Sequence, residues 1–255
     1  MNLSITNPHS LAVNPPLPDN NAMENVVYVP GLLEERVRLA QNKPKRTRTR
    51  LMLLAATAAE LEQSGYEALT INNIVARAGL ARGTFYLYFP NRAEAAIAVR
   101  RSFMAILRKS RPRGGAKLNA WQAIHRMNQF YVSFYARNAR LLAGNGALFH
   151  ERPDLLKNRD QVNHRWAGIL LRDMVRREGL NRLTPEEEKR RMLSLRLVII
   201  MADEALRNAF IDPPPYLSQV ITSHEDLAEV LTTLWYRCLY GKDPDPADKT
   251  AQSNT

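Results

Sequence analysis

The stretch from Thr70 to Phe89, TINNIVARAGLARGTFYLYF, constrains the fold of this chain more than any other. Apolar residues recur at helical spacing after Thr70, which is a favourable N-cap, and Gly79 can adopt the left-handed conformation that ends many helices. A second short segment begins at Ala81 and ends near Pro90. Two short helices joined by a tight turn that contains glycine are typical of a helix-turn-helix, whose second helix enters the major groove of DNA.

The residues of the second helix divide between two faces. Phe85 and Phe89 lie four residues apart, so we expect both to anchor the helix in the core. Gly83 lowers the stability of a helix by about 1 kcal/mol relative to alanine, and close approach of a partner to the backbone would give it a purpose. The other positions, which suit contacts with phosphates and base edges, are Arg82, Thr84, Tyr86 and Tyr88.

Positive charge is concentrated around the same stretch. The chain has 255 residues and a net charge of +11. Residues 44–115 alone hold 13 Lys and Arg against 4 Asp and Glu, a balance of +9. A surface that served only solubility would not need this concentration. A domain that neutralises DNA phosphates does need it.

We expect phosphate contacts on both sides of the predicted helix-turn-helix. The basic arm at residues 43–50, KPKRTRTR, contains Arg46 and Arg48, which would contact phosphates or enter the adjacent minor groove. Such a run can also be only a solvated surface. Asn91 can cap the following helix, and the free N–H groups of its first turn form a phosphate site beside Arg92. Thr70, Tyr86 and Tyr88 complete the expected phosphate contacts, while Arg82, Gly83 and Thr84 are expected nearest the bases.

These residues resemble the DNA-binding domain of TetR-family transcriptional regulators. The resemblance covers about residues 46–105, and it departs from the family at Ala81, where a serine or threonine cap is usual, and at Arg92, where lysine is usual. It implies an all-α fold, with an N-terminal helix-turn-helix domain and a C-terminal helical domain for ligand binding and dimerisation. The matching positions are Gly65-Tyr66, Leu69-Thr70, Ile74-Val75, Ala78-Gly79-Leu80, Arg82-Gly83-Thr84-Phe85-Tyr86, Tyr88-Phe89 and Asn91-Arg92.

The pattern of prolines, glycines and apolar residues divides the chain into four parts. Residues 1–30 contain five of the 15 prolines, and residues 31–42 could form a short amphipathic helix or stay loose. Residues 111–115, RPRGG, are the clearest linker. We therefore predict a disordered leader at 1–43, the helix-turn-helix domain at 44–110, a helical effector-binding and dimerisation domain at 116–241, and a disordered polar tail at 242–255.

The second domain is predicted to be helical throughout, and its last two helices carry apolar residues on more than one side. The expected helices cover about residues 119–136, 138–150, 154–178, 184–210 and 223–240. One face of each of the last two helices packs in the core of its own subunit. The remaining apolar residues at 192–200 and 230–236 therefore need a second partner. The same pair from a second subunit would complete a four-helix interface with two-fold symmetry, and the family resemblance implies this homodimer. It would place two recognition helices about one DNA turn apart on a palindromic double-stranded operator.

The family resemblance also implies a pocket for a small, often apolar effector, whose binding changes the spacing of the recognition helices. The segment 116–210 is rich in aromatic and methionine side chains, although aromatic residues at helical spacing are also typical of an ordinary core. The candidate ligand-binding residues are Trp121, His125, Phe134, Phe149, Trp166, Leu170 and Met174, with Asp203 or Glu204 as polar groups.

No pattern in the sequence predicts catalysis, a cofactor or a metal site. The histidines are not spaced as metal ligands, and the single Cys238, expected to be a buried thiol, can form neither an intrachain disulfide nor a zinc site. Phosphate-binding glycine loops and the nucleophile motif GxSxG are missing. No run of about 18 apolar residues predicts a membrane span, and the first residues do not resemble a secretory signal. We therefore expect a cytoplasmic protein that is not an enzyme.

The predicted function is that of a DNA-binding transcriptional regulator. The family resemblance implies a repressor that a small-molecule effector releases from its operator. An activator or a regulator without a ligand would use the same helix-turn-helix, and a sequence-blind nucleoid protein would use the same charge. The alternative from another class is a basic protein of the membrane surface. No predicted helix pairs a basic face with a continuous apolar face, which counts against that alternative.

Overall fold

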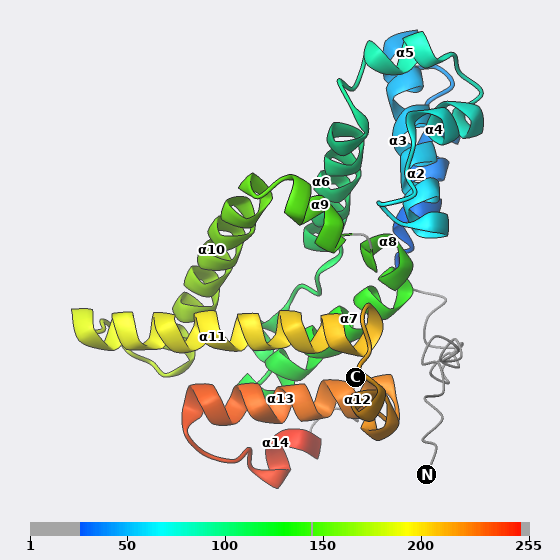
Figure 1. Ribbon diagram of the computed structural model, residues 1–255. Helices are drawn as coiled ribbons and strands as arrows, with labels where there is room; N and C mark the ends of the chain where they lie inside the picture. The colour runs from blue at the N-terminus through cyan, green and yellow to red at the C-terminus, as the bar shows by residue number, and fades with distance from the viewer. Residues whose placement is uncertain (1–25, 144, 251–255) are drawn as a thin grey trace, which may run out of the picture.

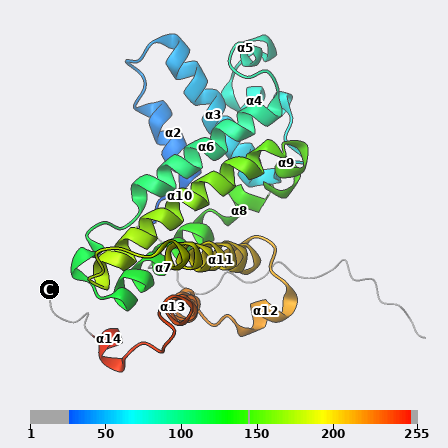
Figure 2. The ribbon, with the colours of Figure 1, turned by 90° about the vertical axis from the view of Figure 1, so that its left-hand side faces the viewer.

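The computed structural model describes residues 26–143 and 145–250, and every regular element in them is helical, as expected. Figure 1 shows α3 to α5 at one end of the molecule and α11 to α14 at the other, and the view in Figure 2 shows the same separation. The first helices are α2 (Val29–Arg38), α3 (Lys45–Ser64), α4 (Ile71–Ala78), α5 (Arg82–Tyr86) and α6 (Arg92–Ser110). A short 3-10 helix η1 (Gly115–Lys117) then precedes α7 (Ala120–Arg137), α8 (Ala139–Ala143), α9 (Asn145–Glu151), α10 (Asp154–Arg177), α11 (Pro185–Phe210), α12 (Pro215–Val220), α13 (His224–Tyr240) and α14 (Pro246–Thr250).

The ends of α4 have the structure that the sequence predicts. The Thr70 side-chain oxygen accepts a hydrogen bond from the backbone N–H of Asn73 at 3.1 Å, so it satisfies a donor of the first turn. Gly79 has φ 64° and ψ 36°, and the N–H of Leu80 donates to the carbonyl of Val75 at 2.9 Å. This is a Schellman motif, which ends α4 and directs the chain into the turn before α5.

One cluster of buried apolar residues, here called the N-terminal core, continues past the linker at residues 111–115. Because helices from both sides of the linker share this cluster, the linker does not separate two independent cores. On one side lie Leu53, Leu69, Ile74, Phe85, Ile97 and Phe103, and on the other lie Phe134, Leu141, Leu142, Leu148 and Leu155.

Helix α2 corrects the expectation that residues 1–43 form a disordered leader. Val29 and Leu33 are buried in the N-terminal core, against α3. The side chain of Asn138, at the end of α7, accepts a hydrogen bond from the Val29 N–H at 2.8 Å and donates one to the carbonyl of Val27 at 3.0 Å. Tertiary contacts therefore fold this segment, whereas residues 1–25 lie outside the described part of the chain.

The C-terminal end brings two further corrections. Residues 246–250 form α14 within the stretch predicted to be a tail, and the Asn119 side-chain amide donates to the Asp248 carbonyl at 3.2 Å, which holds α14 against the start of α7. Cys238 is exposed and not buried, because it lies on the outward side of α13. Residues 251–255 are outside the described part of the chain.

Two smaller clusters, here called the C-terminal cores, hold the long helices together at the other end. Thr184 and Glu187 form a reciprocal capping box at the start of α11, with hydrogen bonds of 3.3 and 2.8 Å. The first cluster comprises Ala167, Leu171, Met174, Leu195, Val198, Ile199, Ala202 and Trp235, and the second comprises Val132, Leu206, Ala228 and Leu231.

Candidate nucleic-acid interface and cavity

Two buried phenylalanines hold α5 against the rest of the molecule. Phe85 is 0% exposed and Phe89 is 4% exposed, and their ring centroids lie 5.7 Å apart. A helix of five residues is not stable alone, so these anchors fix its position and direction. The opposite side of α5 is left to solvent: Arg82 and Gly83 are exposed, and Tyr86 is 48% exposed.

The guanidinium of Arg82 is held between two helices. Its Nη1 donates to the side-chain oxygen of Asn72 on α4 at 2.9 Å, and its Nη2 donates to the hydroxyl of Tyr86 at 3.3 Å. The pair orients the planar fork on the exposed side of α5. An arginine fixed in this way loses less side-chain entropy when it contacts a base edge or a phosphate.

Neither packing nor backbone conformation within the folded chain requires glycine at position 83. A Cβ atom built at this position meets nothing within 4 Å, and the φ angle of Gly83 is not positive. Alanine would therefore fit the folded chain and favour the helix. The open space above Gly83 is where a partner surface can approach the backbone of α5.

The substitution Gly83→Ala is expected to separate stability from DNA binding. It should raise the free energy of unfolding by about 0.5–1 kcal/mol, because alanine favours a helix more than glycine does. It should weaken DNA binding by about tenfold, which corresponds to about 1.4 kcal/mol of lost contact. Urea unfolding and fluorescence anisotropy measure the two effects. Gly168→Ala on α10 is the control, because its Cβ would meet only Arg172 at 3.7 Å; unchanged DNA affinity in Gly83→Ala would contradict close backbone approach.

The basic residues before the helix-turn-helix belong to α3 and not to an extended arm. Figures 1 and 2 place the first turn of α3 and all of α5 at the same end of the molecule. Arg46 and Arg48 are exposed, and Arg48 donates to the carbonyl of Gln41 at 3.3 Å. Because residues 45–50 are helical, they can meet phosphates from a helix surface, which suits the expected phosphate contacts better than the alternative of arginines that enter the adjacent minor groove.

Arg92 has structural partners where the sequence analysis expects a phosphate contact. One Nη donates to the backbone carbonyls of Leu69 and Glu67, at 2.9 and 3.2 Å, and the guanidinium lies 4.9 Å from the centroid of the Tyr66 ring. A weaker ion pair joins Arg92 to Glu151 at 3.7 Å. These contacts support the turn that leads into α4, so Arg92 is better suited to positioning the helix-turn-helix than to contacting a phosphate.

Tyr88 and Thr70 also have structural roles. Tyr88 is half-buried and packs against the N-terminal core, and the Thr70 hydroxyl already accepts the capping hydrogen bond described above. Thr84 is half-buried on α5. The structure thus brings Arg82, Gly83, Thr84 and Tyr86 together on α5.

Residues 53–99 match the model of a family described as bacterial regulatory proteins, tetR family. The matched range extends from α3 through α4 and α5 into α6, which are the helices that carry the geometry described above. The chain is a TetR-family transcriptional regulator. Regulators of this family bind DNA and are not enzymes.

The structure of this TetR-family regulator is similar to solved structures. A TetR-like transcriptional regulator from Rhodococcus sp. RHA1 matches with a TM-score of 0.51 at 14% identity, over 78% of this chain and 100% of that chain. At such identity the likeness concerns the fold alone. The fatty acid degradation regulator FadR from Bacillus halodurans has a TM-score of 0.49 at 16% identity, over 73% and 94% of the two chains. A TetR-family transcriptional regulator from Haemophilus influenzae RD has a TM-score of 0.45 at 21% identity, over 74% of this chain and 98% of that chain. No curated protein matches the chain significantly in sequence.

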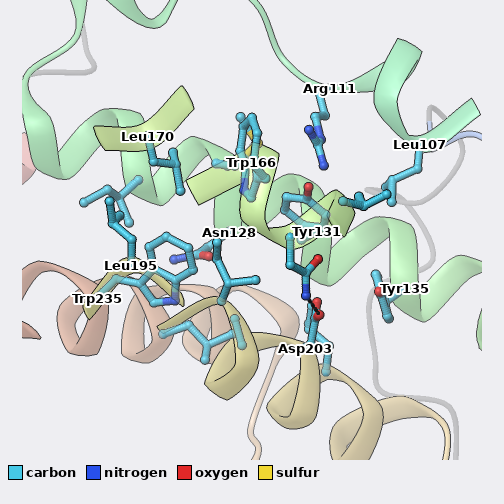
Figure 3. A pocket seen from close by; sticks show the side chains of 18 of the residues that line it. Leu107, Arg111, Asn128, Tyr131, Tyr135, Trp166, Leu170, Leu195, Asp203 and Trp235 are labelled. Carbon is cyan, nitrogen blue, oxygen red and sulfur yellow. Dashed lines mark hydrogen bonds between the residues drawn. The ribbon is translucent and has the colours of Figure 1, made fainter. Parts of the chain in front are cut away.

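A cavity of about 730 Å³ lies between the N-terminal and the C-terminal cores of this TetR-family regulator (Figure 3). Its walls come chiefly from α6, α7, α10 and α11. Trp166 and Leu170 of α10 and Leu195 of α11 give it an apolar lining. The expected ligand-binding residues that line the cavity are Phe149, Trp166, Leu170, Met174, Asp203 and Glu204.

Trp121, His125 and Phe134 do not line the cavity, although the sequence analysis expects them in it. The Trp121 and His125 rings stack at 4.6 Å on another side of α7, and Nδ1 of His125 lies 3.3 Å from the Thr232 hydroxyl of α13. Burial lowers the pKa of His125. Phe134 is in the N-terminal core, 5.3 Å from Phe103 between ring centroids. All three are structural residues.

The arginines and tyrosines of the cavity wall were not among the residues expected from the sequence. Arg100 lies on α6, Arg111 directly follows its last turn, and Arg159 lies on α10, while α7 contributes Tyr131 and Tyr135. Burial raises the pKa of both tyrosines, that of Tyr131 to about 12. The spacing of Tyr131 from Tyr135 was a signal, because residues four apart share one helix face.

The described residues contain no group of three or more side chains arranged to hold a metal ion. The same part of the chain has no helix with the length and apolar character needed to cross a membrane.

Proposed function

We propose that this TetR-family regulator binds a palindromic DNA operator as a homodimer and that a small-molecule effector releases it. The observation that carries the DNA-binding part is the exposed side of α5, where Arg82 is held between Asn72 and Tyr86 beside the open backbone of Gly83. Charge supports it, since residues 44–115 have a balance of +9. Such a protein would repress genes in the cytoplasm.

The contacts with DNA would divide between bases and phosphates. Arg82, Gly83 and Thr84 would lie nearest the base edges, because they begin the helix that enters the major groove. Tyr86, with its hydroxyl on the same exposed side, and the exposed Arg46 and Arg48 would contact phosphates. Residues 44–110 would thus form the DNA-binding part, supported by α2.

The homodimer would form through α11 and α13, and TetR regulators do act as dimers. Leu193, Leu197 and Ile200 of α11 are 59%, 55% and 52% exposed, and they repeat at the spacing of one helix face. Val230 and Leu234 of the neighbouring α13 are exposed in the same way. Two exposed apolar stripes on packed helices favour a second copy of the same pair as their partner.

The cavity supports the effector part of the proposal. It is within the size range of small-molecule sites, and its apolar walls carry a few polar groups. Residues 116–241 provide most of its lining, and α6 and the linker that follows it provide the rest. An effector bound there would favour one position of α6 relative to α10 and α11, and so change the distance between the two recognition helices of a dimer.

Fluorescence anisotropy on the intergenic DNA upstream of the coding sequence, against a scrambled duplex, tests the DNA-binding proposal. We expect tight binding to the native duplex only, and a loss of about 1–3 kcal/mol per half-site in Arg82→Ala, because a base contact is removed. Tyr86→Ala should weaken binding to a similar extent.

Arg165→Ala is the matched control for Arg82→Ala. Arg165 is an exposed residue of α10, so its substitution removes the same charge far from α5. If both arginine variants lost the same affinity, or if both duplexes bound equally with the same steep salt dependence, only non-specific electrostatic binding would be left.

A further inference from the structure

We infer that the effector is an organic anion with an apolar body, and that Arg100, Arg111 and Arg159 bind its charged group. This inference rests on the proposed function, because it names the chemical class that the cavity binds. Among the charged side chains that line the cavity, more arginines than carboxylates have no ion-pair partner. Its other charged groups, apart from Asp203, are already paired with each other or with the backbone.

The pairing of the remaining charges can be followed along the cavity wall. Arg177 forms an ion pair with Asp173 at 2.7 Å, and its two Nη atoms donate to backbone carbonyls at 2.5 and 2.8 Å. Arg207 binds both Glu204 and Asp212. Asp203 is the one lining carboxylate, within the described residues, that has no ion pair. The other lining arginines that have partners are Arg126, which donates to the Arg113 carbonyl, and Arg176, which pairs with Asp173.

The three arginines of the inference have aromatic neighbours where carboxylates would be expected. Arg100 and Arg159 lie over the same Phe149 ring, with guanidinium carbons 4.6 and 5.7 Å from its centroid. In the part of the chain that the structure describes, none of the three comes within 4.0 Å of a carboxylate. Cation–π contacts compensate a guanidinium only in part, so an anion would still gain by binding.

Arg111 presents a donor that has no acceptor. Its guanidinium lies 4.0 Å from the Trp166 ring centroid and 5.5 Å from that of Tyr131, and Figure 3 shows it above the tyrosine hydroxyl. Its Nε is buried and has no hydrogen-bond partner, and the same holds for Nε1 of Trp235 in the cavity wall. A buried donor without a partner is costly. The unsatisfied groups of the wall are therefore donors, which an anion with several acceptor atoms would satisfy.

Asp203 does not make the cavity a cation site. Its carboxylate accepts a hydrogen bond from Asn163 at 3.3 Å, and burial raises its pKa against the lowering effect of that hydrogen bond and of the three arginines. Three guanidinium groups thus face one acid. An ammonium ligand at this end of the cavity would be repelled more strongly than it is attracted.

The position of the arginines connects the anion to DNA binding. Arg100 belongs to α6 and Arg111 directly follows it, and α6 is the helix that continues from the helix-turn-helix; Arg159 belongs to α10. An anion held by all three would fix the distance between α6 and α10. The apolar body of the ligand would occupy the part of the cavity lined by Leu170 and Leu195.

The test uses the full chain and four probes with the same ten-carbon body: decanoate, decyl phosphate, decanol and decylamine. Isothermal titration calorimetry measures affinity, and fluorescence anisotropy measures release from the operator. We expect the two anions to bind at least about tenfold more tightly than decanol, since hydrogen bonds to charged groups are the strong ones. Decylamine should bind most weakly. A preference between decanoate and decyl phosphate would identify which acid group the site fits.

Variants locate the charged group. Arg111→Met and Arg100→Met should each lower anion affinity by about tenfold or more and leave decanol affinity unchanged, which also shows that the variants are folded. Arg108→Met is the matched control, because Arg108 is exposed on α6 and does not line the cavity. Arg159→Met should behave like Arg111→Met.

Four results would overturn the inference. These are equal binding of all four probes, tighter binding of decylamine, unchanged anion binding in the arginine variants, and no binding of any probe. Specific operator binding in the same preparation would leave the proposed DNA-binding function standing in each of these cases. Conversely, anion binding that requires Arg111, in a protein that shows no specific DNA binding, would support the anion site and contradict the proposed function.

Discussion

Replacing Leu197 with glutamate is expected to convert the protein into monomers and to weaken operator binding by about 10³-fold or more, toward the level of non-specific binding. Leu197 is central among the exposed apolar residues of α11, between Leu193 and Ile200. In a two-fold interface the substitution would introduce two carboxylates that lose water without gaining a partner, which costs several kcal/mol. A monomer would keep one recognition helix and so lose half of the contacts with a palindromic operator.

Sedimentation velocity and anisotropy measure the two consequences of Leu197→Glu together. Leu156→Glu is the matched control, because Leu156 is 43% exposed on α10, away from α11 and α13. It should leave the protein dimeric and bound to its operator. A dimer that survives Leu197→Glu with unchanged operator affinity would exclude this side of α11 as the interface.

Replacing Phe85 with alanine is expected to destabilise the protein by about 3–5 kcal/mol and to abolish specific DNA binding. Phe85 is fully buried, it packs against Phe89, and α5 has few other anchors. Without this side chain α5 would lose its fixed position, and the Arg82 fork with it. Chemical unfolding measures the first effect and fluorescence anisotropy the second, while hydrogen exchange of the α5 amides reports the lost position of the helix.

Phe85→Leu separates loss of volume from loss of the aromatic ring. It should cost less, because leucine fills most of the same space, and it should keep measurable operator binding. An alanine variant that retained specific binding and lost less than about 1 kcal/mol would show that α5 does not depend on this anchor.

The sequence was sufficient to predict the elements whose signals are local. Thr70, Gly79 and Thr184 act on backbone groups within a few residues, so their caps could be predicted without knowledge of the fold. The exposed side of α5 was also predictable, because Phe85 and Phe89 leave only one side of so short a helix for solvent.

Features that depend on distant contacts could not be predicted in the same way. Helix α2 is held by α3 and by Asn138, more than a hundred residues away, so its sequence alone resembled a loose leader. On α7, Ile124 and Asn128 line the cavity, whereas Trp121 and His125 pack elsewhere. Successive residues of a helix point about 100° apart, so the crossing of neighbouring helices decides which aromatic residue faces a cavity.

The shared N-terminal core has a mechanical consequence. Helix α7 contributes Val132 to the C-terminal cores and Phe134 to the N-terminal core, and α10 has Leu155 in the N-terminal core and Leu171 in a C-terminal core. The linker at residues 111–115 is therefore not a hinge between two independently packed halves. Helices α7 and α10 therefore join the two sets of cores beside the cavity, and a change in their separation would act directly on the N-terminal core, in which Ile74 of α4 and Phe85 of α5 are buried.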